Sequence, residues 1–324
     1  MAGPALPYDR TYHLLGRFDK IRSMVQAERP DVFEAHSPYL ATAAVVGCGW
    51  RAARARTAFW HADHLGAYVQ PALARLVGEH SADVLERQLW TWIRALLAPF
   101  DATFVAGVAQ ARKLRSAGVK HVVHVPFGVD VLMFRPGARS EARKRELTRG
   151  MPGALLVGVG RFAIEKRWDV VLDAFARVRE GRAATLLLFG DGPERERLER
   201  RAAPGVYFAN FEKDRAKLAS AMASADMLVH SCPYETFGLA VAEAAACGLP
   251  VVVPDKGGAA ESADPSCSET YRSLDADACA AAIERLLARS GPELEARAIA
   301  AAARVPTVAQ HFASVLSVYD ALLR

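Results

Sequence analysis

Two glutamates eight residues apart carry the strongest chemical indication in this sequence. Glu235 and Glu243 flank the segment Phe237-Gly238-Leu239, and an alanine-rich apolar run then leads to Gly248-Leu249-Pro250. A helix that begins at Gly238 would offer free backbone N–H groups and the positive end of its dipole, an arrangement that commonly binds phosphate. A diphosphate bound there would bring each carboxylate near a sugar hydroxyl on one side of it. The plainer alternative is a buried crossover helix with two incidental glutamates.

A basic loop is the second candidate for anion chemistry. Arg161 and Lys166 lie in the pattern Gly160-Arg161-x-x-x-Glu165-Lys166, directly after the strand-like run 155–160. Cations in such a loop stabilise a phosphate on which negative charge grows, and they do so more in the transition state than in the ground state. A solvated basic turn is the alternative for this pair, and Glu165 fits a structural role.

Three further segments extend the pattern. They are Pro126-Phe127-Gly128-Val129-Asp130 with Phe134 and Pro136, then Phe189-Gly190-Asp191-Gly192-Pro193, and finally Gly257-Gly258-Ala259-Ala260-Glu261. With the E-x7-E motif and the basic loop, they make the sequence resemble the retaining GT-B glycosyltransferases, in particular glycosyltransferase family 4 (glycosyl transferase group 1). The resemblance covers the second half of the chain nearly end to end and the first half in part.

The resemblance implies a hexosyltransferase that moves a sugar from a nucleotide diphosphate sugar to an acceptor, with retention of anomeric configuration and without a metal ion. It implies that Glu235 binds the donor-sugar hydroxyls and that Glu243 binds the ribose hydroxyls, because a carboxylate facing a diol accepts two charge-assisted hydrogen bonds. Neither glutamate is expected to be a nucleophile. No cofactor is expected beyond the UDP- or GDP-linked substrate, and the nucleobase, sugar and acceptor stay open. The residues expected to bind the donor are Gly160, Arg161, Lys166, Gly192, Phe237, Gly238, Leu239 and Glu243.

The first half offers a second group of polar residues. His61 ends a strand-like run in Phe59-Trp60-His61-Ala62-Asp63, which resembles the Y-H-T-D stretch of a mannosyltransferase-like branch of the family. In that branch the histidine contacts the donor sugar, so His61 and Asp63 join Glu235 as candidates for the reaction centre. The carboxyl end of a strand is also where α/β proteins place ligands. His36, at the neighbouring strand end, is a weaker candidate, and a structural histidine is the alternative.

Strand-like runs alternate with helical runs, which predicts an α/β protein with parallel sheets. The resemblance implies the GT-B fold, in which two Rossmann-like domains face a cleft. The expected parts are an acceptor-side domain at 1–147, a nucleotide-sugar domain at 148–305 and a final helix at 306–324 that packs back on the first domain, with a charged linker near 139–149. Strands are expected at 31–36, 57–61, 102–106, 121–125, 155–160, 184–189, 227–230 and 251–253, and helices near 17–29, 39–48, 67–98, 108–117 and 307–323.

The first domain begins late in comparison with the family. Its Pro-Asp-Val-x-x-x-His segment occupies residues 30–36. Roughly two βα units, on the order of 60–80 residues, are therefore expected to be absent. This leaves a second functional class open, a non-catalytic or partner-dependent donor-binding remnant of a glycosyltransferase.

Composition narrows the class of protein and of partner. The chain has 324 residues, 52% of them hydrophobic and 24% charged, and neither a long apolar run nor an apolar leader. Five scattered cysteines without a C-x-x-C pair favour reduced thiols, so we expect a cytoplasmic protein. Residues 1–147 hold 20 basic and 13 acidic residues, a net of +7, and the remainder holds 21 and 23, a net of −2. No nucleic-acid motif occurs.

The basic first half has two interpretations. It favours peripheral contact with an anionic membrane face, and Leu89, Trp92, Ile93 and Leu96 would supply the apolar positions of one helix there. Such a membrane face, a lipid-linked acceptor or a phosphorylated acceptor would each suit polysaccharide or glycolipid biosynthesis. The alternative is that this helix packs on the sheet and the charge is an ordinary solvated surface.

Several patterns are expected to be misleading. Asp275-Ala276-Asp277 has the D-x-D form of metal-dependent sugar transferases, but it directly precedes a helical run and suits a helix cap. The pairs His61 with His64 and His121 with His124 are too sparse to predict zinc. Gly158-x-Gly160 lacks the rest of a dinucleotide fingerprint, which argues against an NAD enzyme.

Overall fold

The computed structural model describes residues 2–5, 13–15, 17–36, 42–43, 46, 53–63 and 78–324 of the chain. These residues form two compact units, one of Met1–Pro126 with Ala309–Arg324 and the other of Phe127–Val308. The helix expected at 39–48 and the first part of the helix expected at 67–98 lie largely outside the described residues. Each unit is a parallel α/β domain, as the alternation of strand-like and helical runs predicts.

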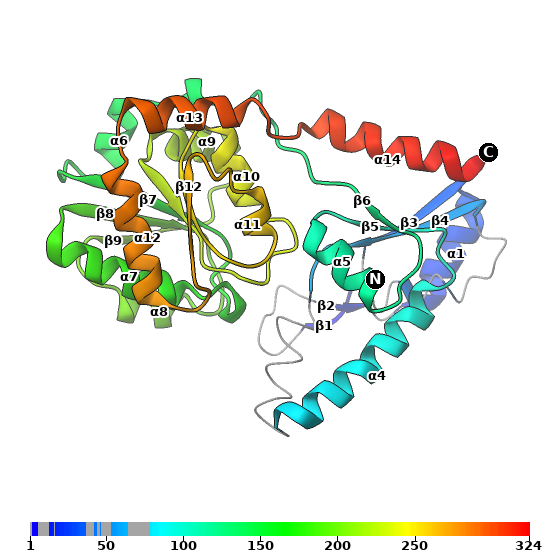
Figure 1. The fold of residues 1–324 in the computed structure, drawn as a ribbon. Helices are drawn as coiled ribbons and strands as arrows, with labels where there is room; N and C mark the ends of the chain where they lie inside the picture. Colours follow the sequence, from blue (N-terminus) through cyan, green and yellow to red (C-terminus); the bar gives the residue numbers. More distant parts are fainter. Residues whose placement is uncertain are drawn as a thin grey trace. The chain divides into compact units, whose positions relative to one another are not determined.

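The first unit is built on a four-stranded parallel sheet in the order β3-β4-β5-β6 (Figure 1). Each strand follows from a β-branched or aromatic run, and β4 and β5 are buried along their whole length. A short antiparallel pair, β1 with β2, precedes it. The elements are β1 Ala2–Ala5, β2 His13–Leu15, α1 Phe18–Glu28, β3 Val32–Ala35, β4 Ala55–Trp60, α4 Glu79–Leu97, β5 Ala102–Val105, α5 Val108–Ser116, β6 Val122–His124 and α14 Val308–Leu323.

Helices cover both faces of this sheet. Alternate side chains of β4 point to opposite faces. Trp60 shares a buried cluster with Ile93 of α4 and Leu114 of α5. On the other face, Phe59 packs near His311 of α14, with ring centres 6.2 Å apart. The structure therefore groups the final helix with the first unit, where α14 packs on the sheet face opposite α4 and α5.

The apolar face of α4 corrects one interpretation of the sequence. Ile93 is fully buried and Leu96 is 9% exposed, so both belong to the core and are not available for insertion into a membrane. Leu89 is half-buried against the same cluster, and only Trp92 among the four is largely exposed, at 47%. The helix packs on the sheet because its apolar stripe is the width that one buried face requires. In the part of the chain that the structure describes, no helix is long and apolar enough to cross a membrane.

The second unit contains a six-stranded parallel sheet in the order β12-β11-β10-β7-β8-β9. The central strands are continuous runs of Leu and Val, which is typical of strands buried on both faces. Its elements are η2 Pro136–Ala138, α6 Glu141–Leu147, β7 Ala154–Val159, η3 Ile164–Lys166, α7 Trp168–Gly181, β8 Ala184–Phe189, α8 Arg195–Arg201, β9 Val206–Ala209, α9 Arg215–Ser224, β10 Met227–Val229, α10 Leu239–Ala246, β11 Val251–Pro254, α11 Gly258–Ser262, β12 Ser268–Tyr271, α12 Ala276–Ala288 and α13 Pro292–Ala302.

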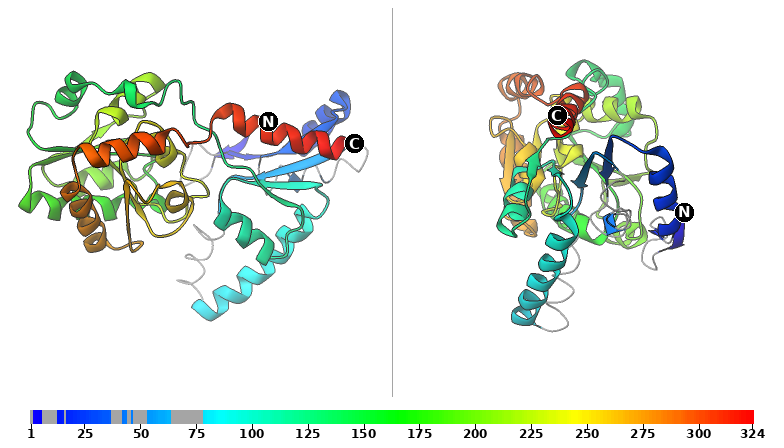
Figure 2. Two further views of the ribbon diagram at one scale, coloured as in Figure 1. Left: turned by 45° about the horizontal axis from the view of Figure 1, so that its top comes forward. Right: turned by 90° about the vertical axis from the view of Figure 1, so that its right-hand side faces the viewer.

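Two helical layers enclose the sheet of the second unit (Figures 1 and 2). On one face, Leu156, Leu186 and Val252 pack against α7 and α12 in one buried cluster. On the other face, Leu155 and Leu187 pack in a second cluster with α9 and α10. Alternate residues of each strand thus serve opposite cores, and the sheet is fixed between them.

The boundary between the units differs from the expected one. The second unit begins at Phe127, whereas the sequence pattern indicates a boundary after residue 147. The charged stretch 139–149 is not a free linker, because it forms α6, whose Lys144 pairs with Asp226 at 2.7 Å. Ser140 caps this helix by accepting a hydrogen bond from the backbone N–H of Arg143. Strands β1, β2, β9 and β12 were not expected from the sequence, since all four are short and only partly apolar.

Candidate functional site

The sheet of the second unit has a topological switch point beside its first strand. The chain runs from β7 outward through β8 and β9, and then returns to place β10 on the other side of β7. The loops that follow β7 and β10 therefore leave the same edge of the sheet on opposite sides. Open α/β sheets bind ligands in the crevice at this position. The two loops, residues 160–167 and 230–238, are the ones that contain the basic pattern and the first glutamate.

An ion pair joins these two loops across the switch point. Lys166 Nζ lies 2.6 Å from Glu235 Oε1, and the two side chains are only 22% and 19% exposed. The hydroxyl of Ser231 donates a hydrogen bond to the backbone carbonyl of Lys166 at 2.5 Å. The imidazole of His230, which is 3% exposed, places Nε2 3.4 Å from the same Glu235 oxygen. His230 was not predicted as a site residue, although it ends the expected strand 227–230 as His36 and His61 end theirs.

The charges of this ion pair are strongly stabilised. Burial is the largest influence and lowers the pKa of Lys166, but the charge and hydrogen bond of Glu235, together with Cys232 and Glu165, outweigh it, so the pKa lies above the ordinary lysine value. Burial likewise tends to raise the pKa of Glu235, but Lys166 and His230 hold it well below the ordinary carboxyl range. Both groups are therefore ionised across the whole physiological range. The site holds a fixed positive charge beside a fixed negative charge.

The glycines of the basic loop allow close backbone packing. The N–H of Gly160 donates to the carbonyl of Phe189 at 3.0 Å, and that of Phe162 donates to Asp191 at 2.9 Å. A Cβ at Gly192 would lie 2.4 Å from the carbonyl oxygen of Phe162, so a side chain there would push the two loops apart. The indole of Trp168 donates to the carbonyl of Arg161 at 2.9 Å. These bonds fix the loop that contains Arg161 and Lys166 against the loop after β8.

The E-x7-E segment forms the loop and helix that its sequence predicts. Gly238 caps the start of α10 with a φ of 84°, a left-handed conformation that favours glycine. The N–H of Gly258 donates to the carbonyl of Glu235 at 2.7 Å. A Cβ at Gly258 would lie 2.4 Å from the backbone of Phe237. The pair Gly257-Gly258 therefore exists to let α11 approach the Glu235–Gly238 loop, and Leu239 is left 45% exposed at the helix start.

Glu243 has a partner that the sequence did not indicate. It lies one turn inside α10, is 5% exposed, and forms an ion pair with the guanidinium of Arg215 at the start of α9. Burial raises the pKa of Glu243 above its ordinary value, and Arg215 offsets this only in part. The guanidinium also lies 4.8 Å from the ring centre of Phe134. A ribose that binds Glu243 must share this carboxylate with Arg215 or displace it.

The first-unit candidates lie together at the ends of β3 and β4. His61 follows β4, and its Nε2 lies 2.7 Å from Nδ1 of His36, which follows β3. The second nitrogen of His36 lies 2.9 Å from Oε1 of Glu34. The hydroxyl of Tyr319 in α14 donates to the other oxygen of Glu34 at 2.7 Å. Glu34 and Tyr319 were missed, since they are 285 residues apart in sequence.

Asp63 occupies a different environment from His61. It is 7% exposed and pairs with Lys113 of α5, whose Nζ lies 2.5 Å from Oδ2. The amide of Gln110 lies 3.4 Å from the same oxygen. These contacts fasten the residues after β4 to α5. Asp63 thus positions this segment, and its expected place at the reaction centre stays a prediction.

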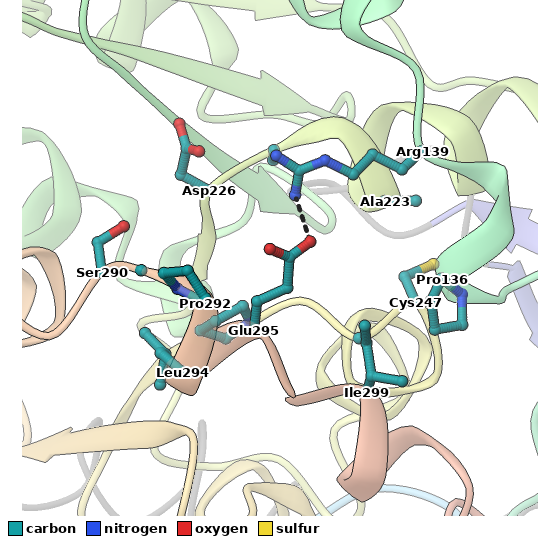
Figure 3. A pocket seen from close by; sticks show the side chains of 14 residues that line it. Pro136, Arg139, Ala223, Asp226, Cys247, Ser290, Pro292, Leu294, Glu295 and Ile299 are labelled. Atoms are coloured by element: carbon teal, nitrogen blue, oxygen red, sulfur yellow. Dashed lines mark ion pairs between the residues drawn. The ribbon is translucent and has the colours of Figure 1, made fainter. Parts of the chain in front are cut away.

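A pocket of about 230 Å³ lies at the opposite edge of the second sheet (Figure 3). Asp226 and Pro250, which immediately precede β10 and β11, line it together with the start of α13. Arg139 and Glu295 face each other across it at 3.8 Å. None of the candidate catalytic or donor-binding residues lines this pocket, and it lies at the amino ends of the strands, away from the switch point.

The D-x-D pattern forms the helix cap that the sequence predicts. Asp275 caps α12 by accepting a hydrogen bond from the N–H of Ala278 at 3.0 Å, so the D-x-D pattern marks a helix start. His124 bonds the carbonyl of Ala106 at 3.0 Å. His64 and Cys48 lie outside the described residues. Within the described ranges, no group of three or more histidine, cysteine or carboxylate side chains is arranged to hold a metal ion.

Comparison with known proteins agrees with this fold. Residues 153–289 match the family model of the glycosyl transferases group 1. HepE from Anabaena, solved with UDP-glucose, superposes with a TM-score of 0.75 at 18% identity, over 93% of this chain and 82% of that one. Sucrose-phosphate synthase from Thermosynechococcus elongatus gives 0.75 at 20% identity, over 98% and 82%. The chain therefore has the α/β fold of the GT-B glycosyltransferases.

Curated relatives indicate the family. The chain is 32% identical over 235 residues to a GDP-mannose-dependent alpha-(1-6)-phosphatidylinositol dimannoside mannosyltransferase of Mycobacterium tuberculosis, covering 72% of this chain and 59% of that protein. It is 32% identical over 263 residues to a GDP-mannose-dependent alpha-mannosyltransferase of Mycolicibacterium smegmatis, covering 79% and 66%. The chain thus spans less than two thirds of the length of these relatives. By sequence and fold together the chain is similar to the family 4-like GT-B glycosyltransferases, and residues 153–289 carry the match to the glycosyl transferases group 1.

Proposed function

We propose that the chain transfers a hexose from a nucleotide diphosphate sugar to an acceptor, with retention of anomeric configuration and without a metal ion. The observation that supports this most is the Lys166–Glu235 ion pair at the switch point, directly before the start of α10. A diphosphate bound there would meet a permanent cation and the first amides of a helix. We propose no cofactor beyond the donor itself.

Each residue of this site has a part in the proposed reaction. As the glycosidic bond breaks, negative charge grows on the departing diphosphate. Lys166 and Arg161 stabilise this charge more strongly in the transition state than in the bound donor. Glu235, held ionised and oriented by Lys166, accepts hydrogen bonds from the donor sugar. Glu243 accepts hydrogen bonds from the ribose. Retention fits a mechanism in which the departing phosphate takes the acceptor proton, since neither glutamate is proposed as a nucleophile.

GDP-mannose is the donor that we propose first. The two mannosyltransferases named above are both GDP-mannose-dependent by name. HepE, however, was solved with UDP-glucose and is similar only in fold. Calorimetry with GDP and with UDP therefore comes before any transfer assay, and tighter binding of UDP would overturn the choice of nucleobase.

Transfer itself is tested with the purified chain and radiolabelled GDP-mannose. Hydrolysis or transfer of mannose is expected, unaffected by a metal chelator, and the anomeric configuration of the product is read by NMR. Arg161→Ala should slow turnover by a factor that corresponds to about 2–4 kcal/mol. Lys217→Ala, at an exposed position on α9, is the control. Donor binding without any turnover would support the alternative, a donor-binding protein that is not catalytic by itself.

We propose an acceptor at a membrane surface and action in the cytoplasm. The net charge of +7 over residues 1–147 supports the first part, as does the phosphatidylinositol-based name of one relative. The described cysteines support the second, since all four are free and buried. Co-sedimentation with vesicles that contain or lack acidic lipid, at low and high salt, tests membrane contact. Binding that needs acidic lipid and is lost in high salt is expected, and no binding at low salt would leave a soluble acceptor.

A further inference from the structure

A continuous hydrogen-bonded chain of three titratable groups lies at the carboxyl ends of β3 and β4. Glu34 Oε1 lies 2.9 Å from His36 Nε2, and His36 Nδ1 lies 2.7 Å from His61 Nε2. The two imidazole ring centres are 5.0 Å apart and the ring planes are 18° from parallel, which fits an edge-to-edge hydrogen bond. Both nitrogens of His36 are thus used, one by a carboxylate and one by a second imidazole.

Glu34 is anchored so that it stays a carboxylate. Tyr319 donates to its Oε2 at 2.7 Å and Thr57 donates to the same oxygen at 3.0 Å. Burial tends to raise the pKa of Glu34, but the bonds from His36, Tyr319 and Thr57 bring it below the ordinary value. An ionised carboxylate can only accept. The Nε2 of His36 therefore carries a proton in every state of the chain above the carboxyl range.

Phe59 and His311 are among the groups that lie near the two imidazoles. Phe59 stacks on His61, with ring centres 4.5 Å apart, and covers one face of the pair. His311 of α14 lies with its ring centre 6.2 Å from that of Phe59, its Nδ1 bonds the carbonyl of Pro126 at 2.8 Å, and its charge is among the causes that lower the pKa of His61. Asp63 is neutralised by Lys113. The nearest full negative charge is that of Glu34, and it acts on His36 first.

The bond between the two imidazoles has two possible directions. While His36 is doubly protonated, its Nδ1 donates to Nε2 of His61, and the neutral His61 must then carry its own proton on Nδ1. When His36 becomes neutral, its only proton is on Nε2, so its Nδ1 accepts from Nε2 of His61. The proton between the rings then belongs to His61, and the proton released to solvent is the one on Nδ1 of His61. Charge and protons balance, since one proton leaves the pair.

We propose that His36, held by Glu34, decides which nitrogen of His61 carries the proton, and so whether His61 offers a donor or an acceptor at Nδ1. This rests on the proposed function and on the resemblance of residues 59–63 to the Y-H-T-D stretch, which implies that His61 contacts an oxygen of the sugar. With the donor form, His61 binds a carbohydrate oxygen as a hydrogen-bond donor. With the acceptor form, it binds the proton of a hydroxyl. His36 and Glu34 are positioning residues that act through His61.

The direction of the pKa shifts agrees with this division. The hydrogen bond to Glu34 raises the pKa of His36 above the ordinary histidine value. Burial, and then the charge of His36, lower the pKa of His61. His36 is therefore the ring that holds the positive charge as pH falls, while His61 stays neutral. The donor form extends to higher pH than an isolated histidine would allow.

Two-bond proton–nitrogen NMR spectra of the whole chain, with isotopically labelled histidine, test the proposal without any substrate. They distinguish the two neutral tautomers of an imidazole at each pH, from about pH 5 upward. His36→Gln and His61→Gln each assign one set of signals. We expect His61 to change from the Nδ1-protonated to the Nε2-protonated tautomer at the pH where His36 titrates. A His61 tautomer that stays the same through the titration of His36 would overturn the proposal.

Glu34→Gln tests the source of the control. The substitution removes the charge and keeps the shape of the side chain. The pH midpoints of the His36 titration and of the His61 tautomer change should therefore both move down by about one pH unit or more. His80→Gln, on an exposed position of α4, is the matched control and should move neither. An unmoved midpoint in Glu34→Gln would overturn the role of Glu34. If this variant does not fold, the wild type still tests the coupling, because its His36 titration and its His61 tautomer change should have the same pH midpoint.

The two proposals fail separately. If the chain binds no nucleotide sugar but the His61 tautomer follows His36, the proposed function is wrong and the coupled pair stands. If transfer occurs but the tautomer does not follow His36, the coupled pair is wrong and the proposed function stands. Because the NMR samples contain no nucleotide sugar, the tautomer measurement does not depend on donor binding or transfer, and the two failures can be told apart.

Discussion

At the scale of single residues, the Lys166–Glu235 ion pair determines the electrostatics of the second unit. Each member is largely buried, so each depends on the other to be charged in that place. Removal of one partner from a buried pair leaves an uncompensated charge, which costs more than the pair itself contributes. The same pair is the candidate binding site for a diphosphate, so stability and binding can be tested on the same side chains.

Lys166→Met should destabilise the chain. The substitution keeps most of the volume but leaves Glu235 without its cation, and we expect a loss of about 3 kcal/mol in the free energy of unfolding. Urea unfolding followed by circular dichroism measures it. Lys217→Met, at an exposed position of α9, should change the free energy by less than about 0.5 kcal/mol. Equal effects of the two substitutions would show that the ion pair does not matter for stability.

The contribution of Glu235 to stability should depend on pH in a defined window. Its pKa in the folded chain is lowered by Lys166, so it binds a proton more readily when unfolded. Its contribution is therefore complete above the unfolded carboxyl value of about 4.3 and is lost as the pH falls toward the folded value. The pKa of Lys166 is raised, so its contribution is complete below about 10.4 and is lost at higher pH.

We therefore expect the free energy of unfolding of Glu235→Gln to differ most from that of the wild type between these two pH values. Urea titrations of both proteins at a series of pH values measure the difference. The difference should decrease as the pH falls below about 4.3, because only the wild type has a carboxylate at position 235 that can be protonated. A difference that grows in acid would contradict the assigned direction of the shift.

At the scale of elements, the two glycines before α11 set the position of the glutamate loop. The backbone of Gly258 approaches that of Phe237 more closely than any Cβ allows, and its N–H holds the carbonyl of Glu235. The loop that carries Glu235 is thus shaped by Gly258, which lies 23 residues further along the chain. A sequence reader sees the G-G-x-x-E pattern but cannot see which backbone it touches.

Gly258→Ala should destabilise the second unit and weaken nucleotide binding. A Cβ 2.4 Å from Phe237 forces the loop to move, and overpacking of this kind costs about 1–3 kcal/mol. The matched control is Gly181→Ala at the end of α7, where a Cβ meets nothing within 4 Å. That change should be neutral or stabilising by up to about 1 kcal/mol. Thermal unfolding and GDP calorimetry of both variants check this, and an unaffected Gly258→Ala would contradict the packing role.

At the scale of the whole molecule, the chain consists of two units with separate cores. The first is closed by α14, which returns from the end of the chain and places Tyr319 on Glu34. The second contains all the residues proposed to bind the donor nucleotide. A ligand that binds one folded unit stabilises that unit by mass action, by about 2.7 kcal/mol at a concentration of 100 times Kd.

Calorimetry should therefore show two unfolding transitions, of which GDP raises only one. The raised transition should be the same one that Lys166→Met lowers, since both changes act in the second unit. Glu34→Gln, in the first unit, should lower the other. A single transition, or an equal rise of both with GDP, would contradict independent units.

The sequence by itself predicted the fold class and most elements of the sheets. Alternating strand-like and helical runs, the E-x7-E segment and the glycine patterns are local features, and local features are what a chain shows directly. Asp275 as a helix cap was predicted for the same reason. The exceptions were β1, β2, β9 and β12, because short strands with mixed polarity do not differ from loops in their pattern.

Only the tertiary structure decided which side chains meet. Arg215 and Glu243 are 28 residues apart, and Tyr319 and Glu34 are 285 apart, so no spacing in the chain links them. The same holds for Asp63, whose place in the sequence indicates the reaction centre but whose carboxylate is held by Lys113. An apolar stripe on α4 shows that one face is buried but not against what. Partnership depends on which elements the sheets bring side by side, and that is a property of the folded chain.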